Sequence, residues 1–163
     1  MKNTALNQLH YTGIVTLSQY NGEEKLELKK VHNAGGNGLF NFLADCLIGD
    51  FDIASMTIPS KIMLLTYNDN KELEKASGFI YKMSKPEKLY TDATGESTVR
   101  YSFQITRDVL EGARFDGIGL YTKNTSEIDC QKYAAFCNIT HKDINLSASS
   151  VLVVDWELTI SNT

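Results

Sequence analysis

Two stretches of the chain have an apolar residue at every second position, which is the pattern of a β-strand with one buried face. Every second residue is apolar in residues 98–106, and the same holds for residues 152–160, whose apolar set includes Trp156. A helix would spread these side chains around its whole circumference. We therefore predict two strands, and we expect Trp156 to be largely buried on the face that it shares with Val154 and Leu158.

Weaker strand patterns recur elsewhere and bring the expected total to about eight. The dipeptide Asn21-Gly22 suits the positive φ angles of a tight turn, and it predicts a hairpin between the first two of these segments. Residues 61–67 are apolar on both faces, so we expect that strand to lie inside the sheet system. The six segments are 13–20, 24–31, 61–67, 78–83, 116–122 and 133–139.

One segment has helical rather than strand periodicity. Apolar residues occur at positions 39, 42, 43, 46 and 47, which is the spacing of one helical face. Asn37 suits the N-cap, and Gly49 follows where a left-handed residue commonly ends a helix. We expect the apolar stripe of this helix to lie on a sheet. The whole pattern predicts a mainly β fold: an antiparallel, jelly-roll-like β-sandwich of about eight strands, with one short helix near 38–48.

Length and composition fit a single domain over residues 1–163, in which residues 1–11 could form an N-terminal arm. The N-terminus lacks the apolar core of a signal peptide, and no apolar stretch is long enough to cross a membrane. We therefore expect synthesis in the cytoplasm of the producing cell and no membrane partner. The net charge is −4 and the basic residues are scattered, which argues against direct nucleic-acid binding.

Candidate chemistry is sparse, and we predict neither an enzyme nor a cofactor. The glycine-rich residues 31–38 lack the lysine of a phosphate-binding loop, so they indicate a sharp turn, although a helix N-terminus can hold an anion. The three histidines and three cysteines lack metal-ligand spacing, and the cysteines are expected to be buried thiols. Asp155 and Glu157 lie about 7 Å apart on one strand face. That spacing fits glycosidase carboxylates, but a solvated face or salt bridges to a neighbour are favoured.

Four stretches, in order along the chain, are similar to a known class of proteins. They are Val31-His-Asn-Ala-Gly-Gly-Asn-Gly-Leu-Phe-Asn-Phe-Leu-Ala-Asp-Cys-Leu-Ile-Gly49, Ile58-Pro-Ser-Lys-Ile-Met-Leu-Leu65, Phe115-Asp-Gly-Ile-Gly-Leu-Tyr121 and Leu152-Val-Val-Asp-Trp-Glu-Leu-Thr-Ile160. Over about residues 12–160 the sequence resembles small virion structural proteins of tailed bacteriophages, including the crAss-like group. The resemblance implies a capsid attachment protein, a neck or tail ring subunit, or a tail-tip component. It supplies no catalytic residues.

These observations favour a structural protein that acts in many copies through protein–protein interfaces, with other virion proteins as partners and the virion as its location. The alternative is a receptor-binding or carbohydrate-binding β-sandwich module, which would need one concave site with clustered aromatic residues. Apolar residues without clear periodicity near the N-terminus and in residues 50–58 are the expected contact residues. They are Leu6, Tyr11, Phe51, Ile53 and Met56.

Overall fold

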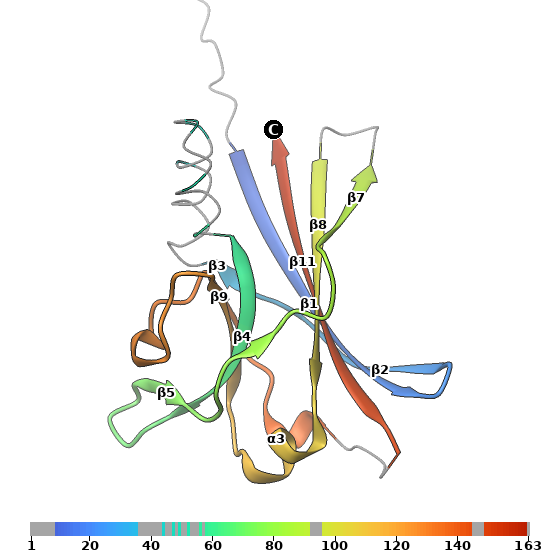
Figure 1. Ribbon diagram of the computed structural model, residues 1–163, viewed down its shortest axis with the longest axis vertical. Helices are drawn as coiled ribbons and strands as arrows, with labels where there is room; N and C mark the ends of the chain where they lie inside the picture. The colour runs from blue at the N-terminus through green and yellow to red at the C-terminus, as the bar shows by residue number, and fades with distance from the viewer. Residues whose placement is uncertain are drawn as a thin grey trace, which may run out of the picture.

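The computed structural model contains two antiparallel β-sheets (Figure 1). It describes residues 9–35, 58–91, 96–144 and 149–162, together with the isolated positions 44, 47, 49, 52 and 56. The five-stranded sheet has the order β2-β1-β11-β8-β7, and the six-stranded sheet has the order β3-β10-β9-β4-β5 with β6 paired to β4. The strands are β1 (Leu9–Asn21), β2 (Glu24–His32), β3 (Ala34–Gly35), β4 (Pro59–Tyr67), β5 (Leu73–Lys75), β6 (Ile80–Tyr81), β7 (Glu87–Thr91), β8 (Glu96–Ile105), β9 (Gly117–Thr122), β10 (Ala135–Cys137) and β11 (Val151–Asn162).

The predicted mainly β, sandwich-like fold is confirmed, and each of the eight expected strands is present. Gly22 has a φ angle of +63°, as the predicted hairpin turn between β1 and β2 requires. The strands that we did not predict are the short ones, β3, β5 and β7. A short helix, α3 (Arg107–Gly112), and two single 3-10 turns, η1 (Glu127–Asp129) and η2 (His141–Asp143), were also not predicted.

The longest strand pairing joins the two ends of the described chain. β1 pairs antiparallel with β11 from Leu9 opposite Asn162 to Tyr20 opposite Val151, so the start of β1 and the end of β11 lie side by side (Figure 1). The last three residues of the possible arm over residues 1–11 belong to β1, where they pair with β11. Residues 1–8 lie outside the described part of the chain.

The main core lies between the two sheets. Trp156 is fully buried on the same face as Val154 and Leu158, which confirms the predicted face of β11. It lies beside Val15 of β1 and Tyr101 of β8 in the strand register. The six-stranded sheet closes this core with side chains that include Ile62, Leu64, Ile118 and Leu120.

A second apolar cluster lies on the opposite face of the six-stranded sheet. It consists of Met63, Leu65, Tyr121 and Phe136, and β4 is therefore buried on both faces, as predicted. The segment between β9 and β10 packs on this cluster through Cys130 and Tyr133, and the segment around β5 and β6 contributes Leu73 and Phe79.

The predicted helix near 38–48 is described at only two positions. Ala44 and Leu47 are helical, and Gly49 has the expected positive φ angle of +74°, while the rest of the segment lies outside the described residues. The side chain of Leu47 is 87% exposed, so the expectation that the whole apolar stripe packs on a sheet is wrong at this position. Asp52 and Met56 are also helical. No helix in the described part of the chain is both long and apolar enough to span a membrane.

Candidate protein interface

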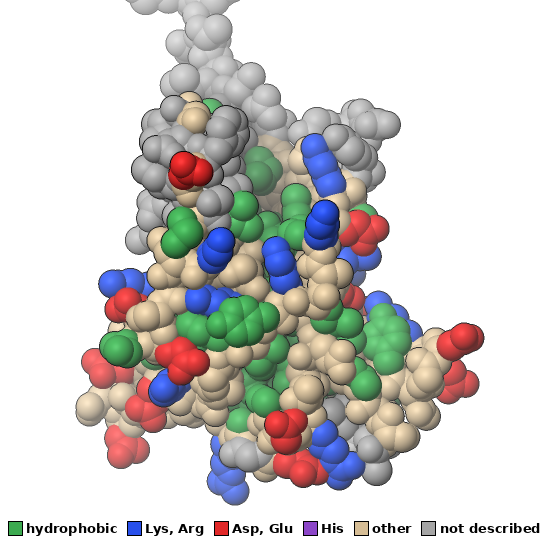
Figure 2. All heavy atoms as spheres, in the orientation of Figure 1, with side chains coloured by type: hydrophobic (Ala, Val, Ile, Leu, Met, Phe, Trp, Pro, Cys, Tyr) green, Lys and Arg blue, Asp and Glu red, His purple; other side chains and the backbone are tan. Residues whose placement is uncertain are grey.

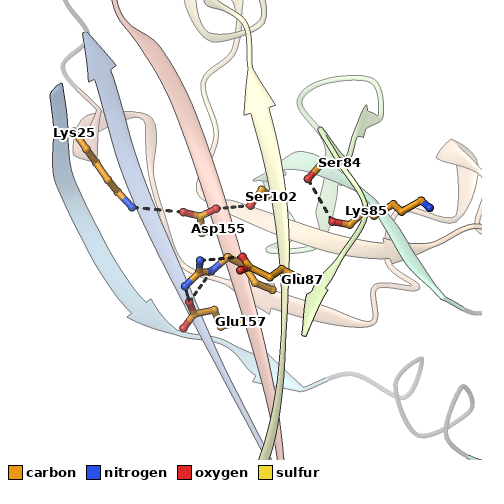
Figure 3. A network of polar contacts seen from close by, with 8 residues as sticks. Lys25, Ser84, Lys85, Glu87, Ser102, Asp155 and Glu157 are labelled. Carbon is orange, nitrogen blue, oxygen red and sulfur yellow. Dashed lines mark hydrogen bonds and ion pairs between the residues drawn. The ribbon is translucent and has the colours of Figure 1, made fainter. Parts of the chain in front are cut away.

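The outer face of the five-stranded sheet carries a network of ion pairs (Figure 3). Arg100 on β8 donates two hydrogen bonds to Oε1 of Glu157 on β11, at 2.9 Å from Nε and 2.7 Å from Nη2, and its Nη1 lies 3.3 Å from a carboxylate oxygen of Glu87. The hydrogen bond to Glu157 raises the pKa of the Arg100 guanidinium. Asp155 accepts a 2.6 Å hydrogen bond from Ser102 and lies 3.7 Å from Nζ of Lys25.

This network decides between the two interpretations of the carboxylate pair Asp155 and Glu157. Both carboxylates are paired with cations of the same sheet, as the salt-bridge interpretation predicted: Glu157 with Arg100 of the adjacent strand β8, and Asp155 with Lys25 of β2, which lies beyond β1. A general acid in a glycosidase needs a carboxyl group whose proton is retained by an apolar or anionic environment. Here Lys25 and Arg100 lie beside the two carboxylates, so the surroundings of both groups are cationic and the salt-bridge interpretation accounts for the pair.

Beside the network the outer face is hollowed into an open depression of about 650 Å³, which we call the socket. One wall is the β1–β2 hairpin with Tyr20 and Lys25, and the floor is formed by β8 and β11. The other wall is the segment between β6 and β7, where the Met83 side chain is 52% exposed. The lining residues are Tyr20, Lys25, Met83, Ser84, Glu87, Arg100, Ser102, Val151, Val153 and Asp155.

Met83 reaches the socket because the chain changes sheets at this point. β6 pairs with β4 in the six-stranded sheet, Lys82 then forms a bridge with Phe103, and the Met83 amide donates a 2.8 Å hydrogen bond to the carbonyl of Ser102. Pro86 interrupts the hydrogen-bonding pattern before β7 continues along β8. The crossing segment is thereby fixed at both ends and holds an apolar side chain at the rim of a polar network.

The second candidate surface, after the socket, is the segment between β9 and β10, which the side chain of Lys61 holds in place. Lys61 lies on β4 and is only 5% exposed. Its ammonium group donates hydrogen bonds to the carbonyl oxygens of Thr125 at 2.5 Å and Lys123 at 3.2 Å, and it lies 4.0 Å from the centroid of the Phe79 ring. Burial lowers the pKa of this lysine. A charge inside an otherwise apolar strand is stabilised here by two carbonyl dipoles and an aromatic face.

Further contacts fix the same segment along its length. Glu127 accepts hydrogen bonds from the Phe79 amide and from Lys75, both at 3.3 Å, and the first of these contributes most to lowering the pKa of the Glu127 carboxyl. The Tyr121 hydroxyl donates to the carbonyl of Cys130, and burial raises the pKa of that tyrosine. The connection from β9 to β10 is therefore held by side chains from β4, β5 and β9.

At the outermost point of this segment an isoleucine is presented to solvent. Ile128 is the middle residue of η1 and its side chain is 94% exposed. We call residues 126–129 the tip. Other large apolar side chains are exposed on the same side of the molecule, including Tyr81, which is 67% exposed. Figure 2 shows hydrophobic side chains open to solvent over β4 and β6, bordered by lysine, arginine and acidic side chains.

The predicted contact residues have different outcomes. Leu6, Phe51 and Ile53 lie outside the described residues. Met56 is partly exposed, and its carbonyl accepts a 3.0 Å hydrogen bond from the Asn124 amide, which places it next to the segment that carries the tip.

Tyr11 is half-buried in the single chain, and its contact with another chain stays a prediction. It belongs to β1, packs against the main core, and its hydroxyl accepts a 3.1 Å hydrogen bond from Asn33. Burial raises its pKa. Strand alternation places Tyr11 on the same face of β1 as Val15 and Leu17.

The remaining candidates for chemistry are dispersed. His10, His32 and His141 lie in β1, β2 and η2. Within the described ranges, no group of three or more His, Cys, Asp or Glu side chains is placed to hold a metal ion. Cys137 is a buried free thiol in β10, as expected, and burial raises its pKa to about 12.

The glycine-rich stretch 31–38 ends β2 and forms β3, whose Ala34 and Gly35 pair with β10. Residues 36–38 lie outside the described part of the chain. The stretch therefore serves, where it is described, to carry the chain from the five-stranded to the six-stranded sheet.

Comparison with known proteins adds no relative. No protein-family model, curated protein or solved structure matches this chain. The functional argument therefore depends on the geometry of the socket and the tip. Sequence reasoning missed Lys61, Met83 and Ile128. Two of them had a visible signal: Lys61 is a charge at the start of an apolar strand, and Ile128 is a lone aliphatic residue in a polar loop.

Proposed function

We propose that this protein is a structural subunit that works in many copies through protein–protein interfaces. The observation that carries the proposal is the display of large apolar side chains by rigidly held segments on two outer faces: Met83 in the socket and Ile128 at the tip. Loop tips are usually polar and mobile. A loop that is ordered in advance loses less conformational entropy when it binds, so a fixed, exposed aliphatic side chain suits a contact residue.

The edges of the five-stranded sheet indicate which kind of contact is favoured. Among the described strands, β2 and β7 form its two edges. β2 carries several lysines and faces a register shift at Leu17 and Ser18 of β1, and β7 is five residues long and follows Pro86. Charges, bulges, prolines and short length all oppose the addition of another strand. For this sheet, its outer face and the neighbouring loop tips, rather than its edges, are therefore the surfaces favoured for assembly.

The virion of a tailed bacteriophage is the assembly that we propose, because the four sequence stretches described above resemble its small structural proteins. The ligand-binding alternative has weaker support. Among its described lining residues the socket has a single aromatic side chain, Tyr20, whereas a sugar-binding platform needs several aromatic faces or one combined with free polar groups. The polar groups of the socket are largely occupied by ion pairs with one another.

The virion role is tested by quantitative mass spectrometry of particles purified from cells that produce the chain. We expect the chain to sediment with intact particles at a fixed ratio to the major capsid protein. Recovery of the chain only in the soluble fraction would contradict a role in the particle. Heat-disrupted particles, in which the chain should be released together with its neighbours, provide the control.

A further inference from the structure

The tip and the socket lie on opposite outer faces of the two-sheet structure. The tip covers the outer face of the six-stranded sheet, because Tyr121 and Cys130 hold its segment over the second apolar cluster. The socket opens on the outer face of the five-stranded sheet. In Figure 1 the connection that carries η1 (orange) projects on the left, and the β1–β2 hairpin that walls the socket projects on the right. The two surfaces of one chain therefore point in opposite directions.

We propose that the tip of one copy of this chain docks into the socket of a second copy. The apolar parts match, because Ile128 projects from the tip and the socket offers the apolar side chains of Met83, Val151 and Val153. Burial of an isoleucine that is 94% exposed in the single chain supplies a hydrophobic driving force. The tip is already ordered by Lys61 and Glu127, so docking does not require it to fold.

The tip region and the rim of the socket each carry one cation and one anion. Beside Ile128 the tip region carries Asp129 and the well-exposed Lys132, which lie 3.3 Å apart. The rim of the socket carries the partly exposed Lys25 and the well-exposed Glu87. Each of these charges keeps its partner in its own chain, and docking adds an opposite charge of the other copy beside the pair, which favours one orientation of the tip in the socket.

The contact rests on the proposed function and gives it a definite geometry. A tip-to-socket contact is heterologous, since each copy uses one surface to bind and a different surface to be bound. Such a contact closes into a ring when its rotation divides a full turn and otherwise extends as a filament. A two-fold dimer, in contrast, uses the same surface on both copies.

The test uses two full-length variants that each lose one side of the contact. Ile128→Asp places a carboxylate in the tip and leaves the socket intact, and Met83→Glu does the reverse. Both side chains are more than half exposed, and circular dichroism checks that each variant is folded. Leu26→Asp is the matched control, because Leu26 is 60% exposed and lies on the hairpin but does not line the socket. Size-exclusion chromatography with light scattering measures the mass of each variant alone and of the mixture.

We expect each variant alone to elute as a monomer of 18.2 kDa and the control to assemble like the unmodified protein. The mixture should form a species of twice the monomer mass and nothing larger, because one intact tip meets one intact socket and the chain of contacts then ends. Variants that assemble like the unmodified protein would overturn the tip-to-socket contact but leave self-association, and with it the proposed function, in place. A mixture of the two variants that stays monomeric would also overturn the tip-to-socket contact. An unmodified protein that is monomeric at every concentration would overturn both the contact and self-association.

Discussion

Lys61→Met is the substitution that most directly probes how the tip is held. Methionine keeps most of the length of the side chain and fits the apolar surroundings, but it removes the ammonium group. The carbonyls of Lys123 and Thr125 then lose the donor that lies 3.2 and 2.5 Å from them. A hydrogen bond to a charged group contributes about 1.5–3 kcal/mol, toward the lower end here because Lys123 is exposed and Thr125 only half-buried, and loss of the contact with the Phe79 ring adds about 0.5–2 kcal/mol.

Part of this loss is offset, because the variant no longer buries a charge. Desolvation lowers the pKa of Lys61, which shows that its burial has an energetic cost. We therefore expect a net decrease of about 2–3 kcal/mol in the free energy of unfolding. Urea denaturation followed by circular dichroism measures it, and Lys123→Met, an exposed lysine in the same segment, is the control that should change stability by less than about 0.5 kcal/mol.

Hydrogen exchange then locates the effect. Amides of residues 123–127 should exchange faster in Lys61→Met, while those of β1 and β11 keep their relative protection, because the anchor acts on one segment. Equal stability of Lys61→Met and the unmodified protein, with unchanged exchange in residues 123–127, would refute the role of Lys61 as the anchor of the tip.

Three further predictions concern the core. Trp156→Ala should lower the free energy of unfolding by about 3–5 kcal/mol, because Trp156 is fully buried. The unmodified protein should show blue-shifted tryptophan emission, and emission like that of free tryptophan in water would contradict the burial of Trp156. Gly13→Ala should cost about 1–3 kcal/mol in thermal or urea unfolding, because its Cβ would lie 1.6 Å from Oδ1 of Asn33; an unchanged midpoint would show that Asn33 moves away freely. Stability should fall as the pH rises from about 9 to 12, because burial raises the pKa of Cys137 from 9.0 to about 12 and that of Tyr101 from 10.0 to about 12. In that range the unfolded chain releases protons that the folded chain retains, so the free energy of unfolding falls by about 1.4 kcal/mol per group for each pH unit. A free energy of unfolding that stays constant from about pH 9 to 12 in urea titrations would argue against this burial.

The sequence predicted those elements in which burial on one face is repeated over several residues. β8 and β11 alternate over nine or more residues, so their inward faces and the position of Trp156 follow from the pattern alone. β3, β5 and β7 have two to five residues, which is too short for any period to be recognised. The six-residue helix α3 has the same problem, since Val109 and Leu110 are its only apolar residues.

The candidate interface was harder to predict because its parts are distant in sequence. Lys61 anchors residues more than sixty positions away, and Met83 joins the socket only because the chain changes sheets after β6. β1 begins four residues before the predicted strand, so Tyr11 lies in a strand that the sequence pattern did not reveal. Local sequence shows that Ile128 lies in a polar loop, but only the fold shows that the loop is held in place.

The central claim, assembly through exposed faces, is tested most directly by sedimentation velocity of the unmodified full-length protein over a wide range of concentrations. The account predicts that the weight-average mass rises above 18.2 kDa with concentration and reaches a species that contains several copies. Added salt should weaken this association, because exposed charges flank Ile128 and Met83. A single sedimenting species at the mass of one chain, at every concentration and salt level, would contradict self-assembly of this protein.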